Sequence, residues 1–281
     1  MSVTKVIVLG GGLSGLSAAH TALENGANVL LLDKNAFLGG SSSKATSGIN
    51  AALTSSQIKL DIKDSVEAFL ADTIASSKTG ATYPLAEVMC GESAPAIEWL
   101  INKFKLDLSL VSRLGGHSFP RTHRGAERFP GMTITYALME MYEEIASKQP
   151  ERARLITRAR ATELVTDASG AVIGAKYEYN GKTFTEYGVV IIATGGYAAD
   201  YEPDSLLKKY RPDVFDMPTT NGPHASGDGI KMAVKIGAEL KDIDKVQVCH
   251  MSSSNTRYPA HINTCKLCVS KYCSVISLYI F

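Results

Sequence analysis

The first 33 residues alternate between continuous apolar runs and a segment with helical periodicity. Residues 6–9 form a run of Val, Ile and Leu, as fully buried strands do. The glycine-rich residues 10–15 then open a segment in which Leu16, Ala19 and Leu23 fall on one helical face. Residues 28–33 form a second strand-like run. The pattern predicts a right-handed βαβ unit within about thirty residues.

The middle of the chain predicts a loop followed by helices. Residues 39–50 are too rich in glycine and serine for a strand and are typical of a binding loop. Residues 114–131 are basic and show no regular period. Helices are expected at residues 61–75, at residues 85–104 with an interruption at Pro95, and at residues 132–147.

The next part predicts three short strands and a return to the first sheet. The turn signals at residues 168–170 and at Asn180-Gly181 separate strands at residues 161–166, 171–179 and 182–187, which gives a β-meander. Residues 189–193 form another buried strand that ends at a glycine turn. Helices at 203–210 and 227–236 and a strand pair at 239–248 follow. The fold class is therefore α/β, a Rossmann-like domain with a parallel sheet plus a β-meander crossover.

Composition excludes several classes of function. The chain has 281 residues, 45% of them hydrophobic and 20% charged, with 29 Lys and Arg against 28 Asp and Glu. This balance favours neither a nucleic acid nor a membrane surface as partner. No apolar run reaches the roughly 20 residues that span a bilayer, and the N-terminus leaves no space for a presequence, so we expect a cytoplasmic protein.

The character of the chain changes at residue 249. From there to residue 281 it contains no Asp or Glu and no clear period. We expect residues 1–248 to form the folded domain and residues 249–281 to be an atypical, poorly ordered tail. Cys265 and Cys268 form a C-x-x-C pair, but its spacing to Cys249 and Cys273 fits no usual zinc pattern, so no metal site is expected.

The glycine turn carries the clearest chemical signal. Gly10, Gly12 and Gly15 fit G-x-G-x-x-G, in which the first glycine permits a tight turn, the second leaves room for a pyrophosphate, and the third lets helix and strand approach. Such turns also occur as plain strand-to-helix connections. Here the motif joins a buried strand to a helix, and Asp33 lies about twenty residues further on, where a carboxylate accepts ribose hydroxyls. The spacing predicts a dinucleotide site.

The segments that follow favour FAD over a nicotinamide cofactor. A nicotinamide domain usually continues with βα units, whereas here a Gly/Ser loop and a meander follow. The loop offers backbone and hydroxyl donors for phosphate or ribitol, although a plain surface loop is the alternative. Asp228, between two glycines, either binds a ribitol hydroxyl or caps the helix that it opens. The loop contains no histidine, so the FAD is expected to be non-covalent.

The chain resembles the soluble fumarate reductases of fungal type, within the flavoprotein subunits of the succinate dehydrogenase and fumarate reductase superfamily. Four stretches carry the resemblance: residues 8–15; residues 39–50, with Gly-Gly-x-Ser and Ser-Gly-Ile-Asn; residues 114–124, Leu-Gly-Gly-His-Ser-Phe-Pro-Arg-Thr-His-Arg; and residues 220–229, with Thr-Asn-Gly and Ser-Gly-Asp-Gly. The third is the most specific, because nucleotide binding alone does not require it. The likeness covers residues 1–248.

The resemblance implies an FAD domain and a capping domain with a dicarboxylate bound between them. Reduced flavin then passes a hydride to one alkene carbon of fumarate, and an arginine of the cap protonates the other, which gives succinate. The candidate cofactor-binding residues are Gly10, Gly12, Leu13, Ser14, Gly15, Asp33, Lys34, Gly40, Ser41, Ser43, Lys44, Thr46, Ser47, Gly48, Ala161, Ala193, Thr194, Gly195, Asn221 and Asp228.

No catalytic residue is assigned, because the chain leaves the family pattern at Cys249, where the family continues with His-Pro-Thr-Gly. The capping domain is therefore expected to be largely absent. His117, Arg121, His123 and Arg124 either contact the dicarboxylate or flavin edge or form a solvated basic loop. The alternatives to fumarate reduction are an inactive, truncated FAD-binding fragment and a flavin reductase for another enoate, such as urocanate or a 3-ketosteroid. The electron donor is not specified by the sequence.

Overall fold

The computed structural model describes residues 3–77, 84–126, 129–246, 248–251 and 266–269. The chain divides into two compact units. The first comprises Met1–Ser41 and Tyr142–Phe281, and the second comprises Ser42–Met141. The predicted boundary at residue 248 stays a prediction, because most of residues 249–281 lie outside the described residues.

A four-stranded parallel sheet organises the first unit. Its strands are β1 (Lys5–Leu9), β2 (Asn28–Leu32), β6 (Ala153–Ile156) and β10 (Val189–Ile192), in the order β10-β1-β2-β6. Val6 pairs with Val29 on one side and with Val189 on the other. Helix α1 (Leu13–Glu24) connects β1 to β2, so the predicted βαβ unit is confirmed.

The predicted meander is also confirmed, as an antiparallel sheet in the order β7-β8-β9. Its strands are β7 (Arg160–Thr166), β8 (Val172–Tyr179) and β9 (Lys182–Tyr187). Asn180 and Gly181 both have positive φ, 50° and 72°, as a tight hairpin turn with two left-handed residues requires.

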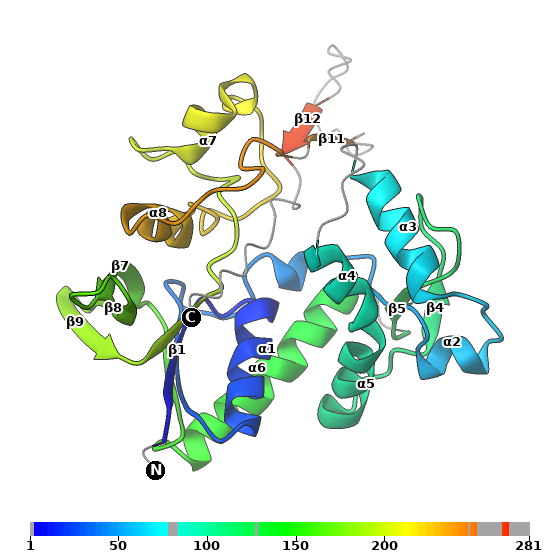
Figure 1. Cartoon of the computed structure of the whole chain (residues 1–281), viewed down its shortest axis with the longest axis horizontal. Coiled ribbons are helices and arrows are strands. Elements are labelled where there is room, and N and C mark those ends of the chain that lie inside the picture. Colours follow the sequence, from blue (N-terminus) through cyan, green and yellow to red (C-terminus); the bar gives the residue numbers. More distant parts are fainter. Residues whose placement is uncertain (1–2, 78–83, 127–128, 247, 252–265, 270–281) are drawn as a thin grey trace, which may run out of the picture. The chain divides into compact units, whose positions relative to one another are not determined.

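Two layers cover the parallel sheet of this unit. Figure 1 shows β1 between the meander on one side and α1 on the other. The meander layer also contains α8 (Asp228–Lys235), which packs against β7. The core that joins sheet, meander and α8 consists of Ile7, Leu9, Leu30, Leu32, Ala159, Leu164, Ala175, Tyr177, Val190, Ile192, Met232 and Ala233.

The rest of the first unit contains short elements. Helix α7 (Leu206–Tyr210) is followed by the 3-10 turn η2 (Pro212–Val214). The strand pair expected at residues 239–248 is wrong, because residues 239–246 form turns and irregular backbone. Strand β11 (Val248–Met251) instead pairs antiparallel with β12 (Lys266–Val269).

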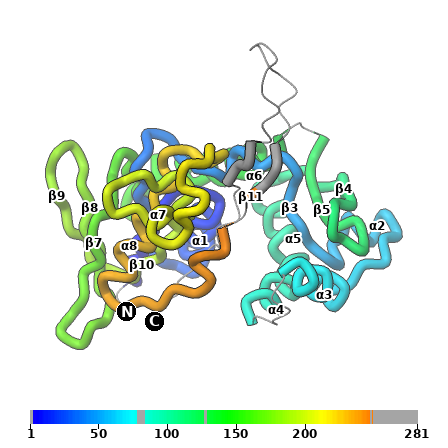
Figure 2. Tube along the Cα trace, turned by 90° about the horizontal axis from the view of Figure 1, so that it is seen from above, coloured from blue at the N-terminus to red at the C-terminus, as the bar shows by residue number. Residues whose placement is uncertain are grey.

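The second unit contains helices and a small sheet. Antiparallel strands lie in the order β3-β5-β4, and Figure 2 shows α3 and α4 side by side. The elements are η1 (Ser42–Lys44), β3 (Ile49–Asn50), α2 (Ser55–Lys59), α3 (Val66–Ser76), α4 (Pro84–Gly91), α5 (Ser93–Phe104), β4 (Leu110–Ser112) and β5 (Thr122–Arg124). Helix α6 (Pro130–Lys148) begins in this unit and ends in the first.

Two predictions for this unit need correction. The long helix is interrupted at Glu92 rather than at Pro95, because Pro95 lies in the first turn of α5, where its missing N–H costs no intrahelical hydrogen bond. The basic segment at residues 114–131 is not irregular throughout, since β5 forms within it and pairs with both β3 and β4.

Candidate dinucleotide site

The first unit has a topological switch point beside β1. From β1 the chain moves to β2 and then β6 on one side, and it later returns to add β10 on the other side. The connections after β1 and after β10 therefore leave the sheet in opposite directions. Ligands of open parallel sheets bind outside the carboxyl ends of the strands at such a point. Gly10 follows β1 there, and Ala193, Thr194 and Gly195 follow β10.

The glycine turn is packed so closely that side chains do not fit at two of its positions. A Cβ on Gly10, where φ is +103°, would lie 2.4 Å from the carbonyl oxygen of Ala193. A Cβ on Gly15 would lie 1.8 Å from the carbonyl oxygen of Gly10. The space beside Gly195, by contrast, is open, with nothing within 4 Å of a Cβ there. The turn fits the role of a pyrophosphate cradle.

The N-terminus of α1 has the properties of an anion site. Gly12 is the N-cap, and none of the described side chains caps this end. The first turn, which includes Leu13, Ser14 and Gly15, contains no acidic residue. The partial positive charge of the helix end is therefore not neutralised by a neighbouring carboxylate on the helix, which suits a phosphate ligand.

Asp33 follows β2, and its carboxylate accepts hydrogen bonds from two backbone N–H groups of the same unit. Its Oδ2 accepts a hydrogen bond from Gly11 N at 2.8 Å, and its Oδ1 accepts one from Asn35 N at 2.7 Å. The residue is 6% exposed. A carboxylate oxygen can accept more than one hydrogen bond, so these contacts fix the group beside the glycine turn without using all of its acceptor capacity.

The start of the Gly/Ser loop lies against the glycine turn. Gly39 N donates to the carbonyl oxygen of Gly11 at 2.8 Å, and Gly39 forms an isolated parallel bridge with Gly12. The Ser41 hydroxyl lies 3.3 Å from Asn221 Oδ1 and 3.2 Å from His224 Nε2. Gly40 and Ser41 are therefore brought together with Asn221.

An ionic cluster joins Lys34 to the start of α8. Lys34 Nζ donates to Ser226 Oγ at 2.6 Å and lies 2.9 Å from Asp228 Oδ2, and Arg160 Nη2 lies 3.2 Å from Asp228 Oδ1. Burial raises the pKa of Asp228, but the hydrogen bonds and charges of Lys34 and Arg160 outweigh it, so this pKa lies below its usual range. Ala161 follows Arg160 in β7.

The capping alternative for Asp228 is wrong. The N-cap of α8 is Gly227, in the left-handed conformation with φ +71°, and no described side chain caps it. Asp228 is the first helical residue, and its carboxylate faces Lys34 and Arg160 instead. A carboxylate at this end of a helix is also favoured by the helix dipole.

The remaining loop candidates belong to the second unit. Lys44, Thr46 and Ser47 are exposed, and Ser43 is half-buried in η1. Gly48 has φ +135°, and a Cβ there would lie 2.4 Å from the carbonyl oxygen of His123, so β3 and β5 pack closely at this point. The structure does not place these five residues relative to the glycine turn, because the two belong to different units.

The basic motif of the second unit centres on a fully buried arginine. The Arg121 side chain is 0% exposed. Its Nε and Nη2 donate to the two carboxylate oxygens of Asp64 at 3.1 and 2.9 Å, and its Nη1 forms an ion pair with Asp72 at 2.9 Å. The guanidinium carbon lies 4.7 Å from the centre of the Phe69 ring. This bidentate pair, together with the second carboxylate, compensates the buried charge.

His123 is also fully buried, and its hydrogen bonds define its tautomer. Nδ1 lies 2.8 Å from the Arg121 carbonyl oxygen, which can only accept, so Nδ1 carries the hydrogen. Nε2 then accepts from the Thr54 hydroxyl at 2.7 Å, and that hydroxyl accepts from Gln57 N. Burial lowers the pKa of His123 and outweighs the hydrogen bonds that raise it, so the ring is neutral at pH 7.

Of the two alternatives for this segment, the solvated basic loop is therefore wrong for Arg121 and His123, which form an internal network. Contact with the dicarboxylate or the flavin edge stays a prediction. His117 and Arg124 are half-buried. Sequence reasoning missed the partners Asp64 and Gln57, and also Arg160, His224 and Ser226. Only Ser226 carried a signal, since it belongs to the Ser-Gly-Asp-Gly stretch. The others are ordinary polar residues whose role depends on distant partners.

Two further expectations concern metals and membranes. Among the described residues, no group of three or more His, Cys, Asp or Glu is placed to hold a metal ion. The cysteine pair weighed as a zinc site involves Cys265 and side chains of β12, which lie outside the described residues. Of the helices that the structure describes, none has the length and apolar character to cross a membrane.

The fold and the glycine turn define a dinucleotide-binding flavoprotein domain, and comparison with known proteins identifies its family. Residues 5–268 match the FAD binding domain family, so the chain belongs to that family and its cofactor is FAD. The predicted cofactor is therefore confirmed.

Within that family, the chain is similar to two named fumarate reductases. The chain is 46% identical over 249 residues to the fumarate reductase of Schizosaccharomyces pombe, covering 87% of this chain and 48% of that protein. It is 38% identical over 253 residues to fumarate reductase 1 of Saccharomyces cerevisiae, covering 88% of this chain and 53% of that protein. The chain thus spans about half the length of these relatives.

The fold has a close structural counterpart. The open conformation of a flavocytochrome c3 fumarate reductase matches with a TM-score of 0.81 and 31% identity, over 89% of this chain and 43% of that chain. The predicted resemblance to the fumarate reductases and the predicted α/β architecture are both confirmed.

Proposed function

We propose that the chain is the FAD-binding part of an oxidoreductase that reduces fumarate to succinate. The observation that carries this proposal is the 46% identity to the fumarate reductase of S. pombe, which extends over 87% of the chain. The match to the FAD binding domain family, over residues 5–268, includes the glycine turn, the Gly/Ser loop and the Arg121 network. The dicarboxylate substrate is proposed on the same ground. The cytoplasmic location stays a prediction.

The residues at the switch point are proposed to hold the FAD. Gly10, Gly12 and Gly15 let the N-terminus of α1 approach the pyrophosphate. The first turn of this helix, which includes Leu13 and Ser14, then faces the negative charge of the phosphates. Asp33 receives the ribose hydroxyls with the acceptor capacity that Gly11 and Asn35 leave. The other proposed FAD contacts are Lys34, Gly40, Ser41, Ser43, Lys44, Thr46, Ser47, Gly48, Ala161, Ala193, Thr194, Gly195, Asn221 and Asp228.

When bound, FAD supplies the hydride for the reduction. The chain's own part is to bind and orient it. The Lys34 and Arg160 pairs hold Asp228, and thereby the start of α8, beside the end of β2 and the start of β7. In the second unit, the Arg121 network fixes β5 and, through it, Gly48 and β3. Non-covalent attachment is proposed because the loop at residues 39–50 contains no histidine.

The test separates FAD binding from substrate choice. The purified chain is loaded with FAD, reduced anaerobically and mixed with fumarate, urocanate, crotonate or a 3-ketosteroid enone, and the flavin absorbance is followed while succinate is assayed. The same assay is run on a chimera in which the S. pombe enzyme supplies the part beyond residue 248. We expect fumarate to reoxidise the flavin fastest in the chimera, with succinate as product.

Two results would contradict the proposal in different ways. A chimera that binds FAD but is reoxidised faster by another enoate would assign the chain to the second class of substrate. A chimera that binds FAD and reacts with none of the acceptors would overturn the enzymatic proposal and leave the alternative of an inactive FAD-binding chain.

A further inference from the structure

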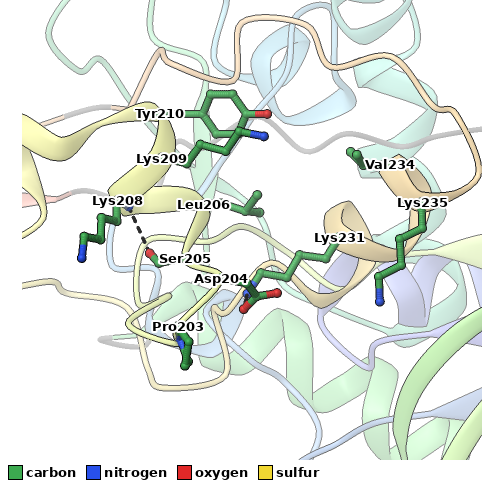
Figure 3. Close-up of a pocket in the computed structure, with 10 residues that line it drawn as sticks. All are labelled: Pro203, Asp204, Ser205, Leu206, Lys208, Lys209, Tyr210, Lys231, Val234 and Lys235. Carbon is green, nitrogen blue, oxygen red and sulfur yellow. Dashed lines mark hydrogen bonds and ion pairs between the residues drawn. The ribbon is translucent and has the colours of Figure 1, made fainter.

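A basic pocket lies between α7 and α8 of the first unit, and none of its lining residues is among those proposed for FAD. Its volume is about 470 Å³, within the usual range for small-ligand sites. Figure 3 shows Tyr210 and Lys209 on one wall, Lys231, Val234 and Lys235 on the other, and Leu206 between them. The remaining lining residues are Pro203, Asp204, Ser205 and Lys208.

One of its four lysines is already neutralised. Lys231 Nζ lies 3.0 Å from Asp200 Oδ1 and 2.8 Å from Asp204 Oδ1, and the Asp200 side chain is 0% exposed. Burial lowers the pKa of Lys231, but these carboxylates outweigh it and raise the pKa above its usual value. Lys231 therefore stays charged and ties α8 to the segment before α7.

Two other lysines carry positive charge outside any ion pair of the described residues, although the charge of Lys235 also helps to lower the pKa of Asp204 in the same pocket. Lys209 and Lys235 are both exposed, and neither forms an ion pair within the part of the chain that the structure describes. Lys209 Nζ lies 4.9 Å from the centre of the Tyr210 ring. Lys208 contributes less, because its Nζ packs 5.8 Å from the Phe215 ring, which does not line the pocket. Charges from two helices thus flank one cavity.

The surface between these charges is apolar. Leu206 is buried, Val234 is 40% exposed, and the Tyr210 ring is half-buried. A simple inorganic anion would use the ammonium groups and leave this surface in water. A ligand that combines a planar apolar ring with a multiply charged group would use both, because aromatic rings stack on tyrosine and phosphate oxygens bridge ammonium groups.

We propose that this pocket binds a nucleotide, with the phosphates between Lys209 and Lys235 and the base against Tyr210, Leu206 and Val234. The site is distinct from the glycine turn that receives FAD, and the proposal does not rest on fumarate reduction. Its phosphate contacts come from exposed lysines, so binding is expected to weaken as salt screens them.

The test is a calorimetric titration of the FAD-loaded chain with ADP, pyrophosphate and adenosine, at low and at physiological ionic strength. Flavin absorbance, recorded in parallel, shows that ADP does not displace FAD from its own site. The variants Lys209→Gln and Lys235→Gln are compared with Lys182→Gln, which removes the same charge at the exposed hairpin between β8 and β9. All three positions are exposed, so the variants are expected to fold.

We expect ADP to bind more tightly than pyrophosphate or adenosine, and Lys209→Gln and Lys235→Gln each to weaken ADP binding about fivefold, from the loss of about 1 kcal/mol per charged contact. Lys182→Gln is expected to have no effect. ADP binding that neither pocket variant changes would overturn the proposal. Equal binding of ADP and pyrophosphate would overturn the nucleotide assignment. The criterion is dependence on the two lysines, and the titration is repeated on the chain without added FAD. Failure to retain FAD would therefore count against the proposed function, while the lysine dependence of ADP binding still decides this proposal. Absence of ADP binding at low ionic strength would also overturn it.

Discussion

The substitution Gly15→Ala tests the closest contact in the glycine turn. An alanine Cβ at this position would lie 1.8 Å from the Gly10 carbonyl oxygen, whereas ordinary contacts begin at 3.4 Å. Because the blocking atom is a backbone oxygen, which cannot rotate away as a side chain can, the start of α1 has to move away from the end of β1 by more than an ångström. Overpacking of this kind costs about 3 kcal/mol, and the better helix propensity of alanine returns about 1 kcal/mol. The expected net loss is about 2 kcal/mol.

The same displacement moves the end of α1 that is proposed to bind the pyrophosphate, so stability and FAD retention are expected to fall together. The melting temperature should drop by about 4–8 °C, and FAD should be lost on gel filtration. The matched control is Gly91→Ala, at the end of α4, where nothing lies within 4 Å of the new Cβ and helix propensity alone should stabilise slightly. Calorimetry and the ratio of absorbance at 450 and 280 nm measure both effects. A Gly15→Ala chain that keeps FAD and melts like the parent would refute the packing argument.

Three further predictions concern the ionic networks. Arg121→Gln leaves the buried Asp64 carboxylate without its cation and should lower the free energy of unfolding by about 3–5 kcal/mol, measured by urea denaturation; a loss below 1 kcal/mol would contradict it. Asp228→Asn removes the partner of Lys34 and Arg160 and should cost about 1–3 kcal/mol in the same assay, and an unchanged midpoint would count against the cluster. Burial lowers the folded-state pKa of His123 below its unfolded value of about 6.5, so the unfolded chain binds the extra proton and stability should fall as pH drops below about 6.5. His123→Gln should make this slope shallower, and the slope that remains includes His117, whose pKa is also lowered by burial. An identical pH profile would contradict the neutral ring.

The parts of the fold that the sequence predicts well are those with local causes. The βαβ unit follows from an apolar run, a glycine turn and a second run, all within β1 to β2. The meander follows from the turn at Asn180 and Gly181, whose positive φ angles few other residue pairs adopt without strain. The glycine motif is informative because Gly10 and Gly15 each lie against backbone of the same unit with no room for a Cβ.

The parts that could not be predicted depend on partners far apart in sequence. Arg121 is paired with Asp64, 57 positions away, so its burial has no local signature, and the sequence alone could not exclude a solvated basic loop. Asp228 is similar, because its partner Lys34 is 194 positions away. Pro95 is an example of a local signal that misleads. Proline usually interrupts a helix, but Pro95 lies in the first turn of α5, where a proline does not interrupt the helix.

The visible absorption spectrum of the purified 281-residue chain tests the central claim most directly, with the chromophore identified after denaturation. A chain that belongs to the FAD binding domain family and places its glycine turn at the switch point should carry about one FAD, released unmodified by denaturation, or take it up when FAD is supplied. A folded chain that stays colourless in excess FAD would contradict the account.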